Sequence, residues 1–237
     1  MKTGDSVITY MAKTGSENLI KFLIEHNADL KKRTQEGKTA LELAALYGNP
    51  ENIKLLAQKG DEAEKQNALV DAASSGSVTA VEALLGLGIS SDARNANAET
   101  PLMMAAQGRH KNIINLLKEH GANINATTDK GKTALMYAAE AVPQNKEVIG
   151  ILLTAGADIN KQDATGNTAL IYAADHAVNY LSTETLEALV KAGADLKVKN
   201  QQGQSALDAL KQQITNSQDK TNSASDMNTV IGLLTAK

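Results

Sequence analysis

The segment TPLMMAAQGRHKNIINLLKEHGANIN, residues 100–125, decides the fold of this chain. It predicts two short helices and a turn, because Thr100 can cap a helix that begins at Pro101 and Gly121 can end a second helix. Each helix has an apolar face but is too short to be stable alone. The segment therefore needs a similar neighbour against which to bury its leucine, isoleucine and alanine side chains.

Copies of this segment recur along the chain. The steps between residues that can cap the first helix of each copy are 33, 28, 33, 33, 35 and 37 residues. These first caps are Ser6, Thr39, Asn67, Thr100, Thr133, Thr168 and Ser205. The predicted caps of the second helix are Ser16, Asn49, Ser77, His110, Asn145, Ser182 and Asp226. Residues suited to a left-handed backbone end that second helix at Asn27, Gly60, Gly88, Gly121, Gly156 and Gly193. Three series in register predict an array of seven helical repeats.

The repeated segments resemble the motifs of ankyrin repeats. The opening motif occurs as TALELAA (39–45), TPLMMAA (100–106), TALMYAA (133–139) and TALIYAA (168–174), and the closing motif as GANIN (121–125), GADIN (156–160) and GADLK (193–197). The resemblance covers about residues 4–237 and implies an all-α solenoid of seven helix-turn-helix units, with right-angled turn tips and little or no strand. The His of the family motif is replaced here by Glu42, Met103, Met136 or Ile171, so its hydrogen bonds are not expected to carry over.

The array is expected to form one domain over residues 1–237. Its predicted units are 4–36, 37–64, 65–97, 98–130, 131–165, 166–202 and 203–237. The rhythm breaks between Gly60 and Asn67, where seven residues replace the usual twelve. This connection is too short for an extended turn, which predicts a gap in the row of turns. The gap either alters the stacking twist or makes room for a protruding segment of a partner. A polar connection, residues 212–225, is expected to be mobile.

Composition excludes several classes of protein. A net charge of -3 over 237 residues argues against a broad surface for nucleic acid or for an anionic membrane. The absence of Cys excludes disulfides and thiolate metal sites. The N-terminal residues lack the apolar core of a secretory signal, and the longest apolar run, residues 148–153, is too short to span a bilayer. We expect a soluble, cytoplasmic protein that is a monomer when free. A signal removed before Met1 would make it periplasmic or secreted, and a composition with only three Arg among 24 basic residues hints at a bacterial source.

The sequence offers no clear catalytic chemistry. His26 and His120 occupy the same repeat position at a helix end, where an imidazole favours the helix dipole, and His110 belongs to the second series of caps. None of these spacings brings together the three or four ligands of a metal site. Ser and Asp are frequent as caps and turn residues, which is a structural role. We expect no enzymatic activity, no catalytic residue, no metal site and no cofactor.

The predicted function is protein binding through the concave face and the turn tips, as in the ankyrin arrays that this chain resembles. The candidate contact residues lie on the turn tips and near the ends of the first helices. They are Arg33, Glu36, Lys38, Leu46, Tyr47, Gln107, Arg109, Lys130, Lys132, Glu140 and Asp175. Because the sequence shows only repeats, we expect the chain to act by occupancy, as an inhibitor or immunity-type blocker. The alternatives are a two-partner scaffold, a secreted host-directed effector, and a ligand-binding protein or enzyme with an unrecognised pocket.

Three further features allow more than one interpretation. The turn at residues 28–38 is the most basic, and is either a solvated tip or a contact for an acidic partner. Met103, Met104 and Met136 cluster on neighbouring first helices, either as core residues or as an adaptable binding surface. Tyrosines recur at one position of the first helix, at Tyr10, Tyr137 and Tyr172. Such a row either packs between repeats or presents tyrosine tips to a partner.

Overall fold

The computed structural model describes residues 6–141, 145–177, 183–216, 231–232 and 234–235. Within these ranges the named elements are all helices, and an isolated antiparallel bridge joins Thr127 to Thr133. The helices are α1 (Val7–Thr14), α2 (Glu17–Glu25), α3 (Ala40–Leu46), α4 (Pro50–Ala57), α5 (Glu62–Ser75), α6 (Val78–Gly86), α7 (Pro101–Gly108), α8 (Lys111–Glu119), α9 (Ala134–Glu140), α10 (Lys146–Thr154), α11 (Ala169–Ala177), α12 (Glu184–Lys191) and α13 (Ala206–Asn216). The predicted all-α fold is confirmed.

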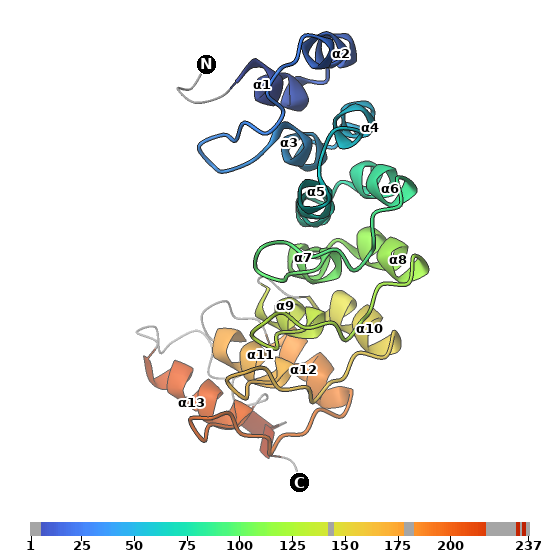
Figure 1. Ribbon diagram of the computed structural model, residues 1–237. Coiled ribbons are helices and arrows are strands. Elements are labelled where there is room, and N and C mark those ends of the chain that lie inside the picture. The colour runs from blue at the N-terminus through green and yellow to red at the C-terminus, as the bar shows by residue number, and fades with distance from the viewer. Residues whose placement is uncertain (1–5, 142–144, 178–182, 217–230, 233, 236–237) are drawn as a thin grey trace. The chain divides into compact units, whose positions relative to one another are not determined.

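The chain forms two compact bodies (Figure 1). The N-terminal body comprises residues 1–123 and holds α1 to α8; the C-terminal body comprises residues 124–237 and holds α9 to α13. In the N-terminal body the first helices of successive pairs, α1, α3, α5 and α7, pack side by side, and the second helices, α2, α4, α6 and α8, form another row. In the C-terminal body α9, α11 and α13 form the first row, and α10 packs against α12. Each body is thus a stack of helix pairs.

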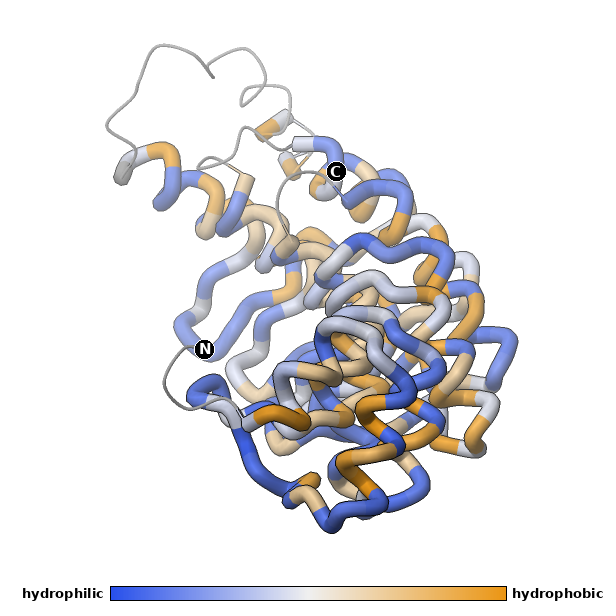
Figure 2. Tube along the Cα trace, turned by 90° about the horizontal axis from the view of Figure 1, so that it is seen from above, coloured by the Kyte–Doolittle hydropathy of each residue, from blue (hydrophilic) through white to orange (hydrophobic). Residues whose placement is uncertain are grey.

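Small apolar side chains fill the seams between the pairs. Leu102, Leu135 and Leu170 occupy the same position of three first helices, and each is 1% exposed. Two alanines near the middle of these helices are also buried, which lets neighbouring helices approach closely. The second helices contribute larger residues, among them Leu117 and Leu152, whereas Leu116 is only half-buried. Every helix named above contributes buried hydrophobic residues, and Figure 2 shows that hydrophobic and hydrophilic segments alternate along the trace.

Most predicted first caps are present, although their chemistry differs from repeat to repeat. Thr39, Thr100 and Thr133 each accept a hydrogen bond from a backbone N–H in the first turn of their helix. The backbone N–H of each Thr in turn donates a hydrogen bond to the side chain of the residue three positions later. At Thr39 the acceptor is the carboxylate of Glu42, at 2.8 Å. At Thr100 and Thr133 the acceptor is a methionine sulfur, of Met103 and Met136, at 3.4 Å. Each capping box therefore survives without the histidine of the family motif.

The predicted second caps are confirmed less often. Asn49 and Ser77 accept the expected backbone hydrogen bonds. Ser16, His110 and Asn145 precede their helices but make no side-chain cap bond. The ring Nε2 of His110 instead donates to the carbonyl oxygen of Ser74 at 3.0 Å. The last two predicted caps, Ser182 and Asp226, lie outside the described residues.

The prediction that Asn67 caps a first helix is wrong. Helix α5 begins at Glu62, and its cap is Asp61, whose side chain accepts from the N–H of Glu64. Asn67 lies inside the helix. The connection from Gly60 to Asn67 is too short for an extended turn, so the chain enters the helix early and adds helical turns to the N-terminal end of α5. Because α5 packs against both α3 and α7, the row of first helices continues through this region.

Gly60 is also not the left-handed helix end that the sequence predicts. The other predicted closing residues have positive φ angles, from 57° at Asn27 to 91° at Gly193, but Gly60 is not among the positive-φ glycines. A Cβ atom at Gly60 would lie 3.1 Å from the side chain of Leu41. A larger residue here would require the Leu41 side chain to shift by a few tenths of an ångström. The polar connection predicted at 212–225 also begins later, because α13 extends to Asn216, and residues 217–225 lie outside the described part.

The turn tips require a left-handed residue two positions before the cap of the next helix. Gly37, Gly131, Gly166 and Gly203 hold that position with φ angles between 75° and 81°. In the fourth helix pair the same position is Ala98, with a φ of 57°. An L-residue with a Cβ atom pays a steric penalty in this conformation that glycine does not pay. This tip is therefore strained where the others are not.

Replacing Ala98 with Gly is expected to raise the free energy of unfolding by about 0.5 to 1 kcal/mol, because relief of strain exceeds the entropy that glycine costs. Urea denaturation followed by circular dichroism measures the change. The matched control is Gly166→Ala, which introduces strain and places a Cβ about 3.0 Å from the backbone of the following tip. A stabilised Gly166→Ala, or a destabilised Ala98→Gly, would contradict this account of the tips.

Candidate protein-binding surface

The candidate contact residues belong to the first-helix rows and the turn tips of both bodies. The N-terminal body carries Arg33, Glu36, Lys38, Leu46, Tyr47, Gln107 and Arg109. The C-terminal body carries Lys130, Lys132, Glu140 and Asp175. The candidates therefore form two separate groups, one on each body.

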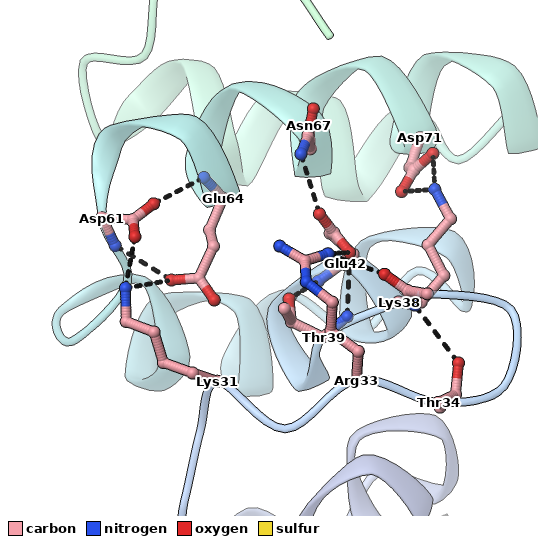
Figure 3. A network of polar contacts seen from close by, with 11 residues as sticks. Lys31, Arg33, Thr34, Lys38, Thr39, Glu42, Asp61, Glu64, Asn67 and Asp71 are labelled. Carbon is pink, nitrogen blue, oxygen red and sulfur yellow. Dashed lines mark hydrogen bonds and ion pairs between the residues drawn. The ribbon is translucent and has the colours of Figure 1, made fainter. Parts of the chain in front are cut away.

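The basic turn of the N-terminal body is bound to α5 by ion pairs (Figure 3). Lys31 pairs with Asp61, and its Nζ lies 3.5 Å from Glu64. Lys38 reaches the carboxylate of Asp71, with Nζ to oxygen distances of 2.6 and 2.5 Å. The basic side chains come from the turn, and their acidic partners are the cap residue of α5 and two residues of the helix itself. The early start of α5 thus places Asp61 and Glu64 where they can pair with the turn.

Arg33 and Glu42 form the centre of this network. Glu42 is 1% exposed, yet its carboxylate is well satisfied. It accepts hydrogen bonds from the backbone N–H of Thr39 at 2.8 Å and from the amide of Asn67 at 3.0 Å. The guanidinium of Arg33 lies 3.4 Å from the same carboxylate and donates to the carbonyl oxygen of Gly37 at 2.7 Å. A buried carboxylate is stable only with such partners.

The direction of each pKa shift in this network depends on whether hydrogen bonding or burial dominates at that group. The hydrogen bond from Lys31 lowers the pKa of the exposed Asp61 carboxyl, and the same bond raises the pKa of Lys31. At Asp71 the direction is reversed, because burial raises its pKa and the hydrogen bond from Lys38 only partly opposes that effect. The Lys38–Asp71 pair is the more shielded one, with side chains 32% and 15% exposed. Solvent screens the Lys31–Asp61 pair more strongly.

Replacing Glu42 with Ala is expected to lower the free energy of unfolding by about 2 to 4 kcal/mol, because the buried N–H of Thr39 and the half-buried amide of Asn67 lose their acceptor. Glu42→Met is the matched variant, since methionine caps the equivalent helices of this chain through its sulfur. It should lose less than Glu42→Ala. Urea unfolding curves measure both. Equal losses for the two variants would show that the cap bond contributes nothing.

In the C-terminal body the candidates Lys132 and Glu140 form an ion pair with each other. The Nζ of Lys132 also lies 4.8 Å from the ring centre of Tyr137 and 4.6 Å from that of Tyr172, within the range of cation–π attraction. The hydroxyl of Tyr172 donates to Asp163 at 2.6 Å. The contacts of Tyr172 with Lys132 and Asp163 join neighbouring repeats, so Tyr172 serves packing between repeats. Tyr137 lies in the same repeat as Lys132 and is buried. Tyr10 differs, because it is 42% exposed in the N-terminal body.

Asp163 and Tyr172 shift each other's ionisation. Burial alone would raise the pKa of Asp163, but hydrogen bonds from Tyr172, Thr165 and the N–H of Asn167 outweigh it, and the pKa lies below the ordinary 3.8. Burial and the bond to Asp163 raise the pKa of Tyr172 above its ordinary 10.0. The stability contributed by Asp163 is therefore complete above pH 3.8 and is lost as the pH falls through its lowered pKa. That contributed by Tyr172 is present below pH 10.0 and is lost as the pH rises through its raised pKa.

Tyr172→Phe is expected to raise the pKa of Asp163 and to weaken the fall in stability on acidification, because a hydrogen bond that favours the carboxylate is removed. The pKa is measured by following the carboxyl carbon of Asp163 by NMR as the pH is lowered. Tyr10→Phe is the matched control, since Tyr10 lies at the equivalent position of another repeat. An unchanged Asp163 titration in Tyr172→Phe would refute the coupling.

The remaining candidates differ in exposure. Tyr47 is 62% exposed at the end of α3, and its neighbour Leu46 is half-buried. Gln107 and Arg109 are exposed at the end of α7. Asp175 is exposed on α11, and Glu36 and Lys130 are exposed on turn tips. Of the methionines considered for this surface, Met103 and Met136 are buried and Met104 is half-buried, which favours the core interpretation.

Sequence analysis missed the acidic partners of the basic turn. Asp61, Glu64 and Asp71 were not among the candidates. The repeat period gave no signal for the Lys38–Asp71 pair, because the step between these two repeats is 28 residues, and the positions that correspond to Lys38 and Asp71 are Gln66 and Leu43. The signal that was available is the capping-box spacing of Asp61 and Glu64. Within the described residues, no helix has both the length and the apolar character needed to cross a membrane, and no group of three His, Asp or Glu side chains could hold a metal ion.

Several known proteins are similar to this chain. Rabbit (Oryctolagus cuniculus) transient receptor potential cation channel subfamily V member 5 is 34% identical over 155 residues, covering 55% of this chain and 21% of that protein. Human neurogenic locus notch homolog protein 2 is 32% identical over 135 residues, covering 54% of this chain and 6% of that protein. The NF-kappa-B inhibitor cactus of Drosophila yakuba is 29% identical over 130 residues, covering 54% and 26%. The chain thus matches about a quarter or less of these relatives.

A solved structure and two family models agree on the fold. The crystal structure of the human ASB11 ankyrin repeat domain matches with a TM-score of 0.75 and 23% identity, and the match covers 98% of this chain and 99% of that domain. The model for ankyrin repeats in three copies matches residues 1–67 and 69–163, and the model for a single ankyrin repeat matches residues 165–201. With this match over most of its length, the chain belongs to the ankyrin-repeat family.

Proposed function

We propose that this chain is a non-enzymatic module that binds one partner protein and blocks it by occupancy. Ankyrin repeats are generally protein-interaction scaffolds. The blocking role is supported by one relative, which is itself named an inhibitor of NF-kappa-B. Stacked repeats present a preformed surface, so little conformational freedom is lost on binding. A standard interface of about 1,600 Å² could then be tight without a deep pocket.

The observation that carries this proposal is the exposure of Tyr47. Tyrosine is enriched among the residues that dominate binding energies, and Tyr47 is the most exposed of the large hydrophobic side chains in the described residues, at 62%. It stands at the end of α3, on the row of first helices. Gln107 and Arg109 hold the corresponding end of α7. We propose these residues, together with Glu36 and Leu46, as the main contact group of the N-terminal body.

The paired cations have a different proposed role. Arg33, Lys38 and Lys132 each have an acidic partner within the chain, and so does the candidate Glu140. A binding partner would contact them as neutralised pairs, which contribute shape and hydrogen bonds more than net charge. Lys130 and Asp175 complete the proposed surface of the C-terminal body. A search for an acidic partner should therefore give less weight to the basic turn than its sequence suggests.

A second candidate function is a scaffold for two partners. It is favoured by the division into two compact bodies, each with its own group of candidate residues. Copurification of the tagged chain from its native source, followed by mass spectrometry, separates the two functions. One stoichiometric protein whose activity is suppressed supports the blocker. Two proteins bound at the same time would reject the blocker in favour of the scaffold.

Tyr47→Ala is expected to weaken binding to the copurified partner by about 2 kcal/mol, or roughly 30-fold, without changing the unfolding curve. Isothermal titration calorimetry measures the affinity. Leu152→Ala is the opposite control, because this fully buried residue should cost about 2 to 5 kcal/mol of stability and leave the contact surface in place. If Tyr47→Ala unfolds the protein while Leu152→Ala leaves its stability unchanged, the assignment of Tyr47 to the surface and of Leu152 to the interior is wrong.

A further inference from the structure

A polar hollow of about 190 Å³ lies on the C-terminal body beside α11 and α13. These helices pack against each other, and the turns that precede them form the rest of the wall. The lining is unusual in composition, because most of its polar side chains are carboxamides. Those are Asn167, Asn200, Gln202, Gln204 and Gln212. The lining contains no Lys or Arg, and Asp175 is its charged residue.

Three of the carboxamides, those of Asn167, Asn200 and Gln204, donate hydrogen bonds through their N–H groups. Asn200 donates to the side-chain oxygen of Asn167 at 2.9 Å, and Gln204 donates to that of Gln212 at 2.7 Å. The side-chain oxygen of Asn200 accepts from the backbone N–H groups of Gln202 and Gln204, at 3.1 and 3.0 Å. A carboxamide oxygen can accept two hydrogen bonds. The oxygens of Asn167 and Gln212 each accept one of the bonds described, so they retain capacity for a further donor.

Two carboxylates lie in the lining of the hollow or close to it. The carboxylate of Asp175 is exposed and accepts a bond through Oδ1 from the amide of Gln213, at 2.7 Å. The nearby Asp163 carboxylate is held in its charged form by the hydroxyl of Tyr172, which also lines the hollow. The neighbouring Lys132 is already paired with Glu140. Asp175 thus places a carboxylate in the lining, and Asp163 places a second one beside it.

We propose that the hollow receives an arginine side chain of the partner protein, with the guanidinium against Asp175 and the carboxamide oxygens. This proposal rests on the proposed protein-binding function. A guanidinium is planar, carries five N–H donors and has no acceptor, so it can donate to the oxygens of Asn167 and Gln212 and to the carboxylate of Asp175. An ammonium group offers three donors on a point charge and is more strongly hydrated. The hollow is several times the volume of one water molecule, about 30 Å³, which leaves space for the guanidinium and its last methylene groups.

The test uses short blocked peptides, so it does not depend on knowing the partner. The full chain, labelled with ¹⁵N, is titrated with N-acetyl-Gly-Arg-Gly-amide and with the same peptide carrying citrulline, which keeps the shape and removes the charge. Shifts of the side-chain NH₂ signals of the hollow report binding. The arginine peptide is expected to bind at least about tenfold more tightly than the citrulline peptide, because charge-assisted bonds are the stronger ones.

Variants locate the site. Asp175→Asn should bring the arginine peptide to the affinity of the citrulline peptide. The matched control is Asp129→Asn, at another exposed aspartate of the same body, which should leave the difference intact. Equal binding of arginine and citrulline, equal binding of a lysine peptide, or a loss in both variants would overturn the proposal. None of these results would affect the copurification experiment or the effect of Tyr47→Ala, so failure of the arginine site is distinguishable from failure of the proposed function.

Discussion

The fold depends on the burial of small apolar side chains between successive helix pairs. A helix of seven to fourteen residues is marginal in isolation, and each pair in this chain acquires its stability from the next. Alanine near the middle of the first helices permits close approach, and leucine and isoleucine fill the space toward the second helices. Because neighbours supply the contacts, no single core has to grow with chain length. The rows of first helices can therefore present side chains that packing does not use.

Spacing in the sequence was enough to predict the repeats, the helical class and most of the caps. It was least reliable where the period changed. The connection from Gly60 to Asn67 correctly indicated a missing turn tip, but the placement of the cap at Asn67 failed because it assumed that the helix would begin at the usual position. The local signal for the true cap was present, since Asp61 and Glu64 have the spacing of a capping box. The periodic pattern outweighed it in the prediction.

The candidate surface was harder to predict than the fold. Exposure of Tyr47 follows from its place at the end of a first helix, two residues after the last buried residue. The pairing of Arg33 and Lys38 does not follow from their own segment, because their partners lie on α3 and α5. The polar hollow was also beyond sequence reasoning. Its wall is assembled from two helices and two turns, and its acceptor character depends on which amide donates to which.

The extended α5 has a consequence for how this array could change over time. Repeats of this kind are often imagined as interchangeable modules that can be duplicated, deleted or shuffled. Here α5 and its cap residue carry carboxylates that pair with cations of the turn before α3, and α5 supplies the amide that donates to the buried carboxylate on α3. Removing or transplanting either α5 or the turn together with α3 would leave charged groups of the other segment without their partners. The two are therefore expected to be inherited together, as a single evolutionary block inside an otherwise modular chain.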